Sequence, residues 1–328
     1  MVDLWIENCK FSDTNLSMDK IYGRKFWKKV LMGFISYPEI DEFLDMGSVG
    51  GILFIGKEGA GKTSLINAFL GELSKQEYFI LNVKGRSLLN PEEELNIKME
   101  RLVDECVNCV EDKVVVVLED MDFLEDMENF SFYIAEKMSF LETKKNHLIW
   151  ILSALDEEHI PSVLRDEMIL CPVLCPNDED RKEYLKDMIG DYIYSENNFN
   201  IDTIVDMTDG FTFAELTWLV VFIRAEIKSI LVEKYNPDFS DISITLENIF
   251  IGEKYFKEVV EYIKYKLKDN QVDKNNFDIP LVFQQMGYHQ QSNPAQNTGE
   301  YNKNDTIDSS EDLKADNLSV EEILNLGV

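Results

Sequence analysis

Apolar positions in the first half of the chain fall into short runs that alternate with segments of helical spacing. Strands are predicted at five apolar runs, at residues 50–55, 77–83, 113–118, 147–154 and 168–175. Helical spacing of apolar residues predicts helices at 62–73, 92–112 and 129–140. Because right-handed crossovers join strands that alternate with helices, the pattern predicts a parallel sheet covered on both faces.

The pattern changes after residue 176, where helical spacing continues without another strand. Helices are predicted at residues 180–189, 200–208, 213–235 and 246–267. Residues 269–328 become rich in Gln, Asn, Ser and Asp, so they are predicted to form a largely disordered tail that buries too little apolar surface to fold. The last residues, from Leu318 to Leu326, fit a short helix that either docks on a partner or packs back on its own domain.

Charge and composition narrow the classes of protein. The chain of 328 residues carries 62 Asp and Glu against 32 Lys and Arg, a formal net charge of −30. Nucleic-acid binding needs cations that displace counterions, so a nucleic-acid partner is not expected. The start of the chain lacks the apolar segment of a signal peptide, and no apolar run is long enough to span a bilayer, so a cytoplasmic protein is expected.

Four of the five cysteines form two pairs, Cys106 with Cys109 and Cys171 with Cys175. Both pairs lie in apolar periodic segments that are predicted to be core elements. Free thiols are therefore predicted, with a zinc site as the alternative.

A glycine-rich loop joins the strand at 50–55 to the helix at 62–73. Its spacing, G-x-x-x-x-G-K-T, is that of a phosphate-binding loop, in which backbone N–H groups surround phosphate, the lysine reaches the β and γ phosphates, and the threonine binds Mg²⁺. Residues expected to contact a nucleotide here are Gly56, Glu58, Gly59, Ala60, Gly61, Lys62, Thr63 and Ser64.

The apolar strand at 113–118 runs directly into Glu119 and Asp120. Next to a phosphate loop, such carboxylates hold Mg²⁺ and polarise a water molecule, so Thr63, Glu119 and Asp120 are the predicted metal ligands. The alternative is a strand that simply runs out of the core into solvent. Asp122 is interpreted as a structural or interface carboxylate.

Residues 18–265 resemble the AAA+ ATPases, and specifically the AAA clade. The resemblance rests on the phosphate loop, on the segment from Met18 that precedes it, on residues 160–168 and on the stretch "TDGFTFAELTWLV". It implies that Ile21, Tyr22 and Gly23 touch adenine, that Gly210 and Ala214 belong to the lid's nucleotide motif, and that Arg165 reaches into a neighbouring subunit's site.

The resemblance implies an α/β fold, with a P-loop parallel-sheet domain followed by a small all-helical lid. Expected divisions are a short N-terminal segment at 1–17, the nucleotide-binding domain at 18–176, the lid at 177–268 and the tail at 269–328. ATP and Mg²⁺ are the implied ligands. The implied partners are further copies or homologous AAA subunits in a ring, together with a protein substrate.

Four departures from the family pattern point to weak hydrolysis without threading. The carboxylates occur in the order Glu119–Asp120, where most of the family has Asp then Glu, and the shorter Asp120 is expected to hold water less well. Met168 stands in place of a second arginine finger. Ser153 is the nearest substitute for a water-orienting asparagine, although a buried serine with satisfied hydrogen bonds fits as well. The fourth is the pore loop, where Pro91 to Glu94 replace an aromatic grip.

Two hypotheses follow. The first is an ATPase that remodels or assembles a protein partner; the second is a degenerate scaffold subunit that holds ATP and hydrolyses little of it. Glutamates after a proline also make a good helix start, so the sequence of the pore loop fits a structural role too.

Overall fold

The structure is a computed structural model that describes residues 4–12, 16–35, 51–88, 94–123, 127–145, 147–158, 160–193, 201–235, 251 and 253–268. The predicted tail, its terminal helix, and Pro91, Glu92 and Glu93 of the predicted pore loop lie outside these residues.

Five parallel strands form one sheet, which confirms the predicted α/β class. The strands are β1 (Gly51–Ile55), β2 (Phe79–Lys84), β3 (Lys113–Glu119), β4 (His147–Ala154) and β5 (Ile169–Pro172). Their order is β2-β3-β4-β1-β5, so β4 separates the phosphate-loop strand β1 from the carboxylate strand β3. The carboxyl ends of all five strands therefore meet at one edge of the sheet, where ligands of open α/β sheets bind.

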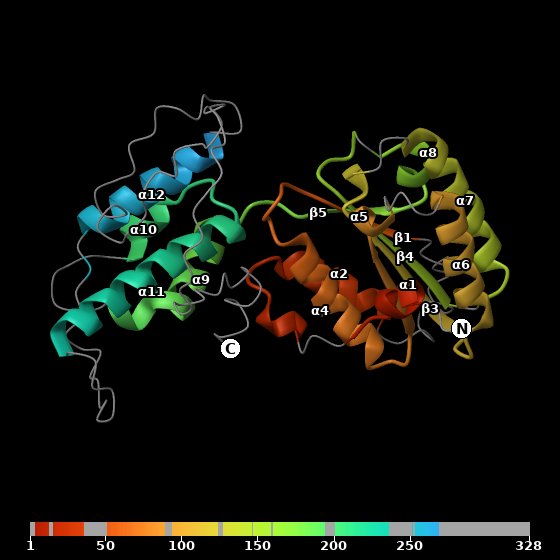
Figure 1. Ribbon diagram of the computed structural model, residues 1–328, viewed down its shortest axis with the longest axis horizontal. Helices are drawn as coiled ribbons and strands as arrows, with labels where there is room; N and C mark the ends of the chain where they lie inside the picture. Colours follow the sequence, from red (N-terminus) through yellow and green to blue (C-terminus); the bar gives the residue numbers. More distant parts are fainter. Residues whose placement is uncertain are drawn as a thin grey trace, which may run out of the picture. The chain divides into compact units, whose positions relative to one another are not determined.

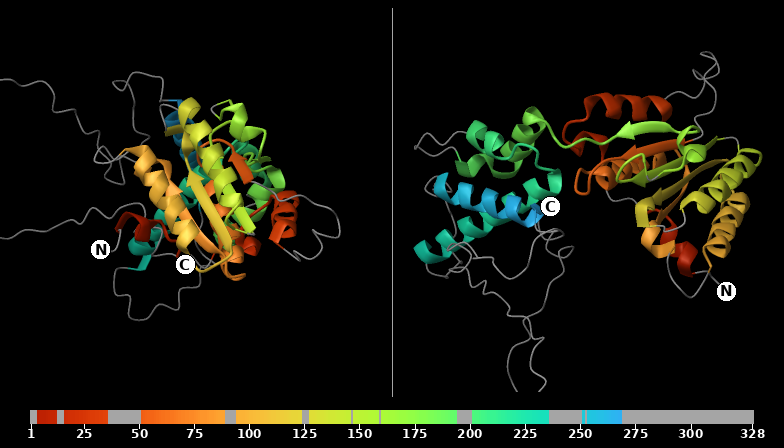
Figure 2. Two further views of the ribbon diagram at one scale, coloured as in Figure 1. Left: turned by 90° about the vertical axis from the view of Figure 1, so that its right-hand side faces the viewer. Right: turned by 90° about the horizontal axis from the view of Figure 1, so that it is seen from above.

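Helices cover both faces of the sheet (Figures 1 and 2). On one face lie α2 (Lys25–Ile35) and α4 (Lys62–Ser74), and on the other lie α6 (Leu95–Asn108) and α7 (Met127–Glu142). The valines of β3 divide between them, because Val115 and Val117 pack with the first pair and Val114 and Val116 with the second. This alternation places Glu119, two residues after Val117, on the α4 face of β3.

The N-terminal segment covers the edge of the sheet at β2. Helix α1 (Leu4–Cys9) and the residues after it lie beside this strand, where Phe11 N–H donates to the Ile80 carbonyl oxygen over 3.1 Å. An antiparallel bridge joins Lys10 to Leu81. An unpaired edge exposes backbone donors and acceptors, so this segment protects the sheet from pairing with other chains.

The short helices are η1 (Met18–Lys20) before α2, α5 (Gly85–Leu88) after β2, η2 (Met121–Phe123) after β3 and α8 (Ser162–Arg165) after β4. The predicted helix start near residue 92 is wrong by three residues, because Glu94 has an extended backbone (ψ 141) and α6 begins at Leu95.

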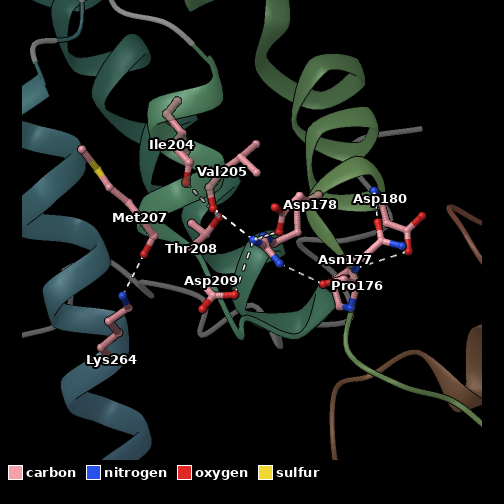
Figure 3. A network of polar contacts seen from close by, with 11 residues as sticks. Pro176, Asn177, Asp178, Asp180, Ile204, Val205, Met207, Thr208, Asp209 and Lys264 are labelled. Atoms are coloured by element: carbon pink, nitrogen blue, oxygen red, sulfur yellow. Dashed lines mark hydrogen bonds and ion pairs between the residues drawn. The ribbon is translucent and has the colours of Figure 1, made fainter.

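The rest of the described chain is helical, with α9 (Asp178–Ile193), α10 (Ile201–Met207), α11 (Phe213–Tyr235) and α12 (Glu253–Lys268) packed together. A buried arginine, Arg181, joins them: its guanidinium donates to the Pro176 and Val205 carbonyl oxygens over 3.0 and 3.2 Å, and to Asp178 over 2.7 Å. Figure 3 shows these partners converging from the segment before α9, from α9 itself and from α10. Because removing one partner of such a network leaves uncompensated groups in the interior, Arg181 ties α9 to α10.

Cys106 and Cys171 are buried in the two apolar clusters on opposite faces of the sheet. The two cysteine pairs that are close in the sequence therefore cannot share one metal ion. All five cysteines have free thiols. Among the described helices, none combines the length and apolar character needed to cross a membrane.

Candidate nucleotide site

The loop between β1 and α4 bends back on itself so that its backbone surrounds the start of α4. Gly59 has φ 74, a conformation that favours glycine, and a Cβ there would lie 2.7 Å from the Ala214 Cβ. Lys62 Nζ lies within the loop and donates to the carbonyl oxygens of Gly56 and Lys57 over 2.6 and 3.3 Å. The loop thus presents a lysine and the N-terminus of a helix of 13 residues at one place, an arrangement that suits an anion.

The surroundings of Lys62 change the pKa of its side chain. Burial lowers the pKa of the ammonium below its ordinary value of 10.5, while the carboxylates of Asp122, Asp120 and Glu58 act in the opposite direction. A bound polyphosphate would favour the protonated form in the same way as these carboxylates do.

A cavity of about 430 Å³ opens beside the loop, and we call it the phosphate-loop cavity. This volume falls within the range of small-molecule sites. Its walls are formed by Glu58, Gly59, Gly61, Lys62, Thr63, Ser64, Arg86, Asp120, Asp122, Leu155, Phe213, Ala214 and Thr217. Residues from the loop, from the ends of β2, β3 and β4, and from α11 therefore meet here.

Thr63 also lines a second cavity, of about 450 Å³, together with Glu119 and Asn82. Glu119 is only 1% exposed, and neither of its carboxylate oxygens has a hydrogen-bond partner among the described residues. An ionised carboxylate without a partner is costly to bury, so the pair formed by Thr63 and Glu119 fits a hard cation with oxygen ligands. Thr63 and Glu119 are thus the residues that could hold magnesium.

Asp120 lies on the opposite side of the strand end, in the phosphate-loop cavity. Its backbone has φ 56, rare for a residue other than glycine, and its N–H donates to Ser153 Oγ over 2.9 Å. Ser153 is fully buried in β4, and its hydroxyl fixes the backbone of Asp120. Asp120 thus faces the loop, while Glu119 faces α4.

Two further charged residues line the cavity: Asp122, which was interpreted as a structural or interface carboxylate, and Arg86, which the sequence did not point to. Asp122 lines the cavity, and its Oδ1 accepts a hydrogen bond from Leu155 N–H over 2.5 Å, which joins the ends of β3 and β4. Arg86, in α5, lines the same wall as Asp120. Neither residue lies in the phosphate-loop motif or the carboxylate pair, and Arg86 reaches the cavity because β2, the strand before it, lies beside β3.

Beside the loop, Phe213 lines the cavity and belongs to a cluster of aromatic and cationic side chains, which we call the Phe213 cluster. Its ring centroid lies 5.6 Å from that of Tyr184 and 6.4 Å from that of Tyr22, and the Arg24 guanidinium lies 5.0 Å from the ring. Arg24 also donates to the Ala60 carbonyl oxygen in the loop. Burial, with a hydrogen bond from Tyr22 to Asp187, raises the pKa of Tyr22 to about 12.

Several residues expected at the site do not line the phosphate-loop cavity. Ile21, Tyr22 and Gly23 are not in the lining: Tyr22 belongs to the Phe213 cluster, Lys28 donates to the Ile21 carbonyl oxygen, and the Asp180 carboxylate fills the space next to Gly23. Other expected residues outside the lining are Gly56, Ala60, Gly210 and Arg165.

Two of these residues have other surroundings. Gly210 has φ 76 in the turn before α11, whose start is capped by Thr212 N–H donating to Glu215 over 2.5 Å and Glu215 N–H donating to Thr212 Oγ1 over 3.4 Å. The Arg165 side chain is 39% exposed and lies 3.9 Å from Asp166.

Residues 52–171, which span nearly the whole sheet, match the model of the ATPase family associated with various cellular activities (AAA). The chain carries an AAA domain. Its structure is similar to the crystal structure of the FIGL-1 AAA domain in complex with ADP, with a TM-score of 0.60 and 16% sequence identity over 84% of this chain and 93% of that one. No curated protein matches the chain by sequence. The likeness confirms an AAA fold in which β1, β3 and β4 bring the loop, the carboxylates and Ser153 to one edge.

Proposed function

We propose that this AAA protein binds ATP with magnesium, hydrolyses it slowly, and uses the cycle to remodel or assemble a protein partner within a cytoplasmic ring. In this proposal residues 18–176 bind the nucleotide and residues 177–268 act as its lid. The observation that carries it is the meeting of Lys62, Thr63 and two adjacent carboxylates at one edge of the sheet, where the buried Glu119 has no hydrogen-bond partner in the described part of the chain.

We assign the reaction to the chain's own groups as follows. Lys62 binds the β and γ phosphates, and Thr63 and Glu119 hold magnesium, which would offset phosphate charge when bound. Asp120 orients a water molecule whose oxygen attacks the terminal phosphorus. The bond from that phosphorus to the β–γ bridging oxygen breaks, ADP keeps the electron pair on this oxygen, and the proton of the water passes through Asp120 to solvent.

Slow turnover is expected because Asp120 is one methylene shorter than glutamate and has a constrained backbone (φ 56). In an Asp120→Glu variant the longer side chain reaches farther into the cavity, so kcat should rise about threefold or more, a change of roughly 1 kcal/mol in activation free energy. Phosphate release under saturating ATP measures this, and a lower kcat would contradict the role assigned to Asp120.

Exposed side chains support assembly into a ring. Along α11, Ala214, Trp218, Val221 and Ala225 form an exposed apolar stripe at helical spacing, with Trp218 48% and Val221 44% exposed. Arg165 is exposed as well, as a residue acting on a neighbour's nucleotide must be. Threading of polypeptide is not expected, because residues 85–98 contain no aromatic side chain.

A second candidate function is a scaffold subunit that holds ATP and hydrolyses little of it. It is favoured by Phe213, whose ring lines the cavity and packs against Tyr184 and Arg24, so it takes up space that a base could otherwise occupy. A partner docked through the tail fits either function.

Phosphate release by the purified chain, alone and mixed with AAA proteins encoded beside it, tests the two candidates. Release that is lost in Lys62→Ala supports the enzyme. Nucleotide binding without release in either sample supports the scaffold, and the absence of nucleotide binding rejects both.

A further inference from the structure

We propose that Arg86 binds the terminal phosphate of ATP from within the same chain and acts there as a catalytic residue. This inference rests on the proposed ATP site, and it assigns to the chain itself part of the work that AAA rings are expected to take from a neighbour's arginine. Arg86 is the second residue of α5 and lines the phosphate-loop cavity together with Lys62, Thr63 and Asp120.

The backbone before Arg86 is pressed against the end of β3. A Cβ on Gly85 would lie 2.4 Å from the Asp120 carbonyl oxygen and 3.0 Å from that of Glu119. Any larger residue would push α5 away from the two carboxylate-bearing residues. Glycine at 85 therefore lets the next side chain, Arg86, start beside Asp120.

The backbone after Arg86 is held as firmly. The buried ammonium of Lys98, from α6, donates to the carbonyl oxygens of Ser87 and Leu88 over 3.1 and 3.0 Å. Ser87 Oγ donates to the Lys84 carbonyl oxygen over 2.7 Å. With both flanks fixed, Arg86 has a defined position on the cavity wall, which is what a charge-stabilising group needs.

The charges that line the cavity explain why a second cation, besides Lys62, matters for binding ATP. Among the residues lining the cavity, Lys62 and Arg86 are the two cations, and they share it with three carboxylates, those of Glu58, Asp120 and Asp122. A triphosphate adds several negative charges to this set. Lys62 binds inside the loop near the Gly56 carbonyl oxygen, whereas Arg86 lies on the Asp120 side, where the attacking water is assigned.

A guanidinium suits this task chemically. It donates two parallel hydrogen bonds to phosphate oxygens and stays charged at any physiological pH. As the bond to the β–γ bridging oxygen breaks, negative charge spreads over the terminal phosphoryl oxygens, and Arg86 would stabilise that charge. Met168, where a second arginine finger would stand, leaves the site short of one such group.

Equilibrium binding of ATPγS and ADP to the full chain tests the inference without requiring turnover. In Arg86→Ala the affinity for ATPγS should fall about 10- to 100-fold, as expected for hydrogen bonds between charged groups, while the affinity for ADP changes less than about threefold. Arg101→Ala is the matched control, because it removes an exposed arginine from α6 that does not line the cavity. Arg86→Lys should recover part of the affinity for ATPγS.

Mixing variants then separates action within one chain from action between chains. Arg165→Ala mixed with Lys62→Ala should regain phosphate release, because the Lys62→Ala chain supplies Arg165 to its neighbour. Arg86→Ala mixed with Lys62→Ala should not, since each chain then carries a damaged site of its own.

The outcomes are distinct. Equal losses for ATPγS and ADP, no loss for either, or recovery on mixing Arg86→Ala with Lys62→Ala would each overturn the role of Arg86 and leave the ATP site standing. If the unmodified chain binds neither nucleotide, the proposed function fails, and this inference fails with it.

Discussion

The phosphate-loop cavity and the Phe213 cluster beside it are built in different ways. The cavity wall at the loop comes from neighbouring residues of one segment, Gly59 and Gly61 to Ser64, with Asp120 from a neighbouring strand. The Phe213 cluster comes from side chains that are far apart in the sequence, since Arg24, Tyr184 and Phe213 belong to three separate segments. Groups that bind phosphate can thus be fixed by local backbone conformation, whereas the contacts of Phe213 depend on how distant helices pack.

Replacing Lys62 by alanine tests the phosphate loop, and it is the change with the largest expected effect on ATP binding. Loss of its charge-assisted hydrogen bonds should weaken ATP binding about 100-fold. Lys75→Ala is the matched control, because Lys75 follows the same helix and its exposed ion pair with Glu72 contributes little. Calorimetric titration with ATP measures both variants, and equal affinities would remove Lys62 from the site.

Glu119→Gln should separate binding of the metal from binding of the phosphate. The neutral amide cannot hold magnesium as a carboxylate does, so the gain in ATP affinity on adding Mg²⁺ should shrink about tenfold, while affinity in EDTA stays the same. The amide also replaces a buried carboxylate that has no hydrogen-bond partner among the described residues, so without nucleotide the free energy of unfolding should rise by about 1–3 kcal/mol. Urea unfolding checks this, and a less stable variant would show that Glu119 has a stabilising partner.

Phe213→Ala tests the Phe213 cluster. Removing the ring should make room for a base, so ATP affinity should rise about 3- to 10-fold, a gain of roughly 1 kcal/mol, while the affinity for tripolyphosphate, which has no base, stays the same. A fall in ATP affinity alone would mean that the base stacks on the ring. Equal changes for both ligands would mean that Phe213 shapes the loop itself.

The smallest expected effect is the dependence of stability and of ATP affinity on pH. The pKa of Lys62 is below 10.5 in the folded chain, so the unfolded state binds more protons between that lowered pKa and 10.5, and the contribution of Lys62 to stability rises with pH in this window. ATP favours the protonated lysine, so its affinity should fall across the same window. Lys62→Arg should abolish this fall, because arginine stays charged. An unchanged pH profile in Lys62→Arg would assign the effect to another group.

The sequence alone predicts those parts whose chemistry is local. Five apolar runs gave the five strands, and the spacing from Gly56 to Thr63 located the loop, because both signals arise within a few residues. The separation of Asp120, in the phosphate-loop cavity, from Glu119, in the second cavity, was not predicted, since both were expected to hold the same metal ion.

What the sequence could not predict depends on tertiary packing. Arg86 reaches the cavity because β2, the strand before it, lies beside β3. The contacts of Phe213 with Arg24 and Tyr184 have no local signal in the sequence. The contact of Ile21, Tyr22 and Gly23 with adenine, which the family resemblance implies, stays a prediction.

One hydrogen bond connects the phosphate loop to the start of α11, so a movement of the loop would also move this helix. Ala214 N–H, at the start of α11, donates to the Gly59 carbonyl oxygen over 3.1 Å. With 23 residues, α11 extends for about 35 Å from this bond. A rotation of about 10° at the loop would move the distant end of such a rod by about 6 Å. A change in the loop that is no larger than a bond length can therefore become a displacement the size of a side chain at the distant end of α11, where another molecule could make contact.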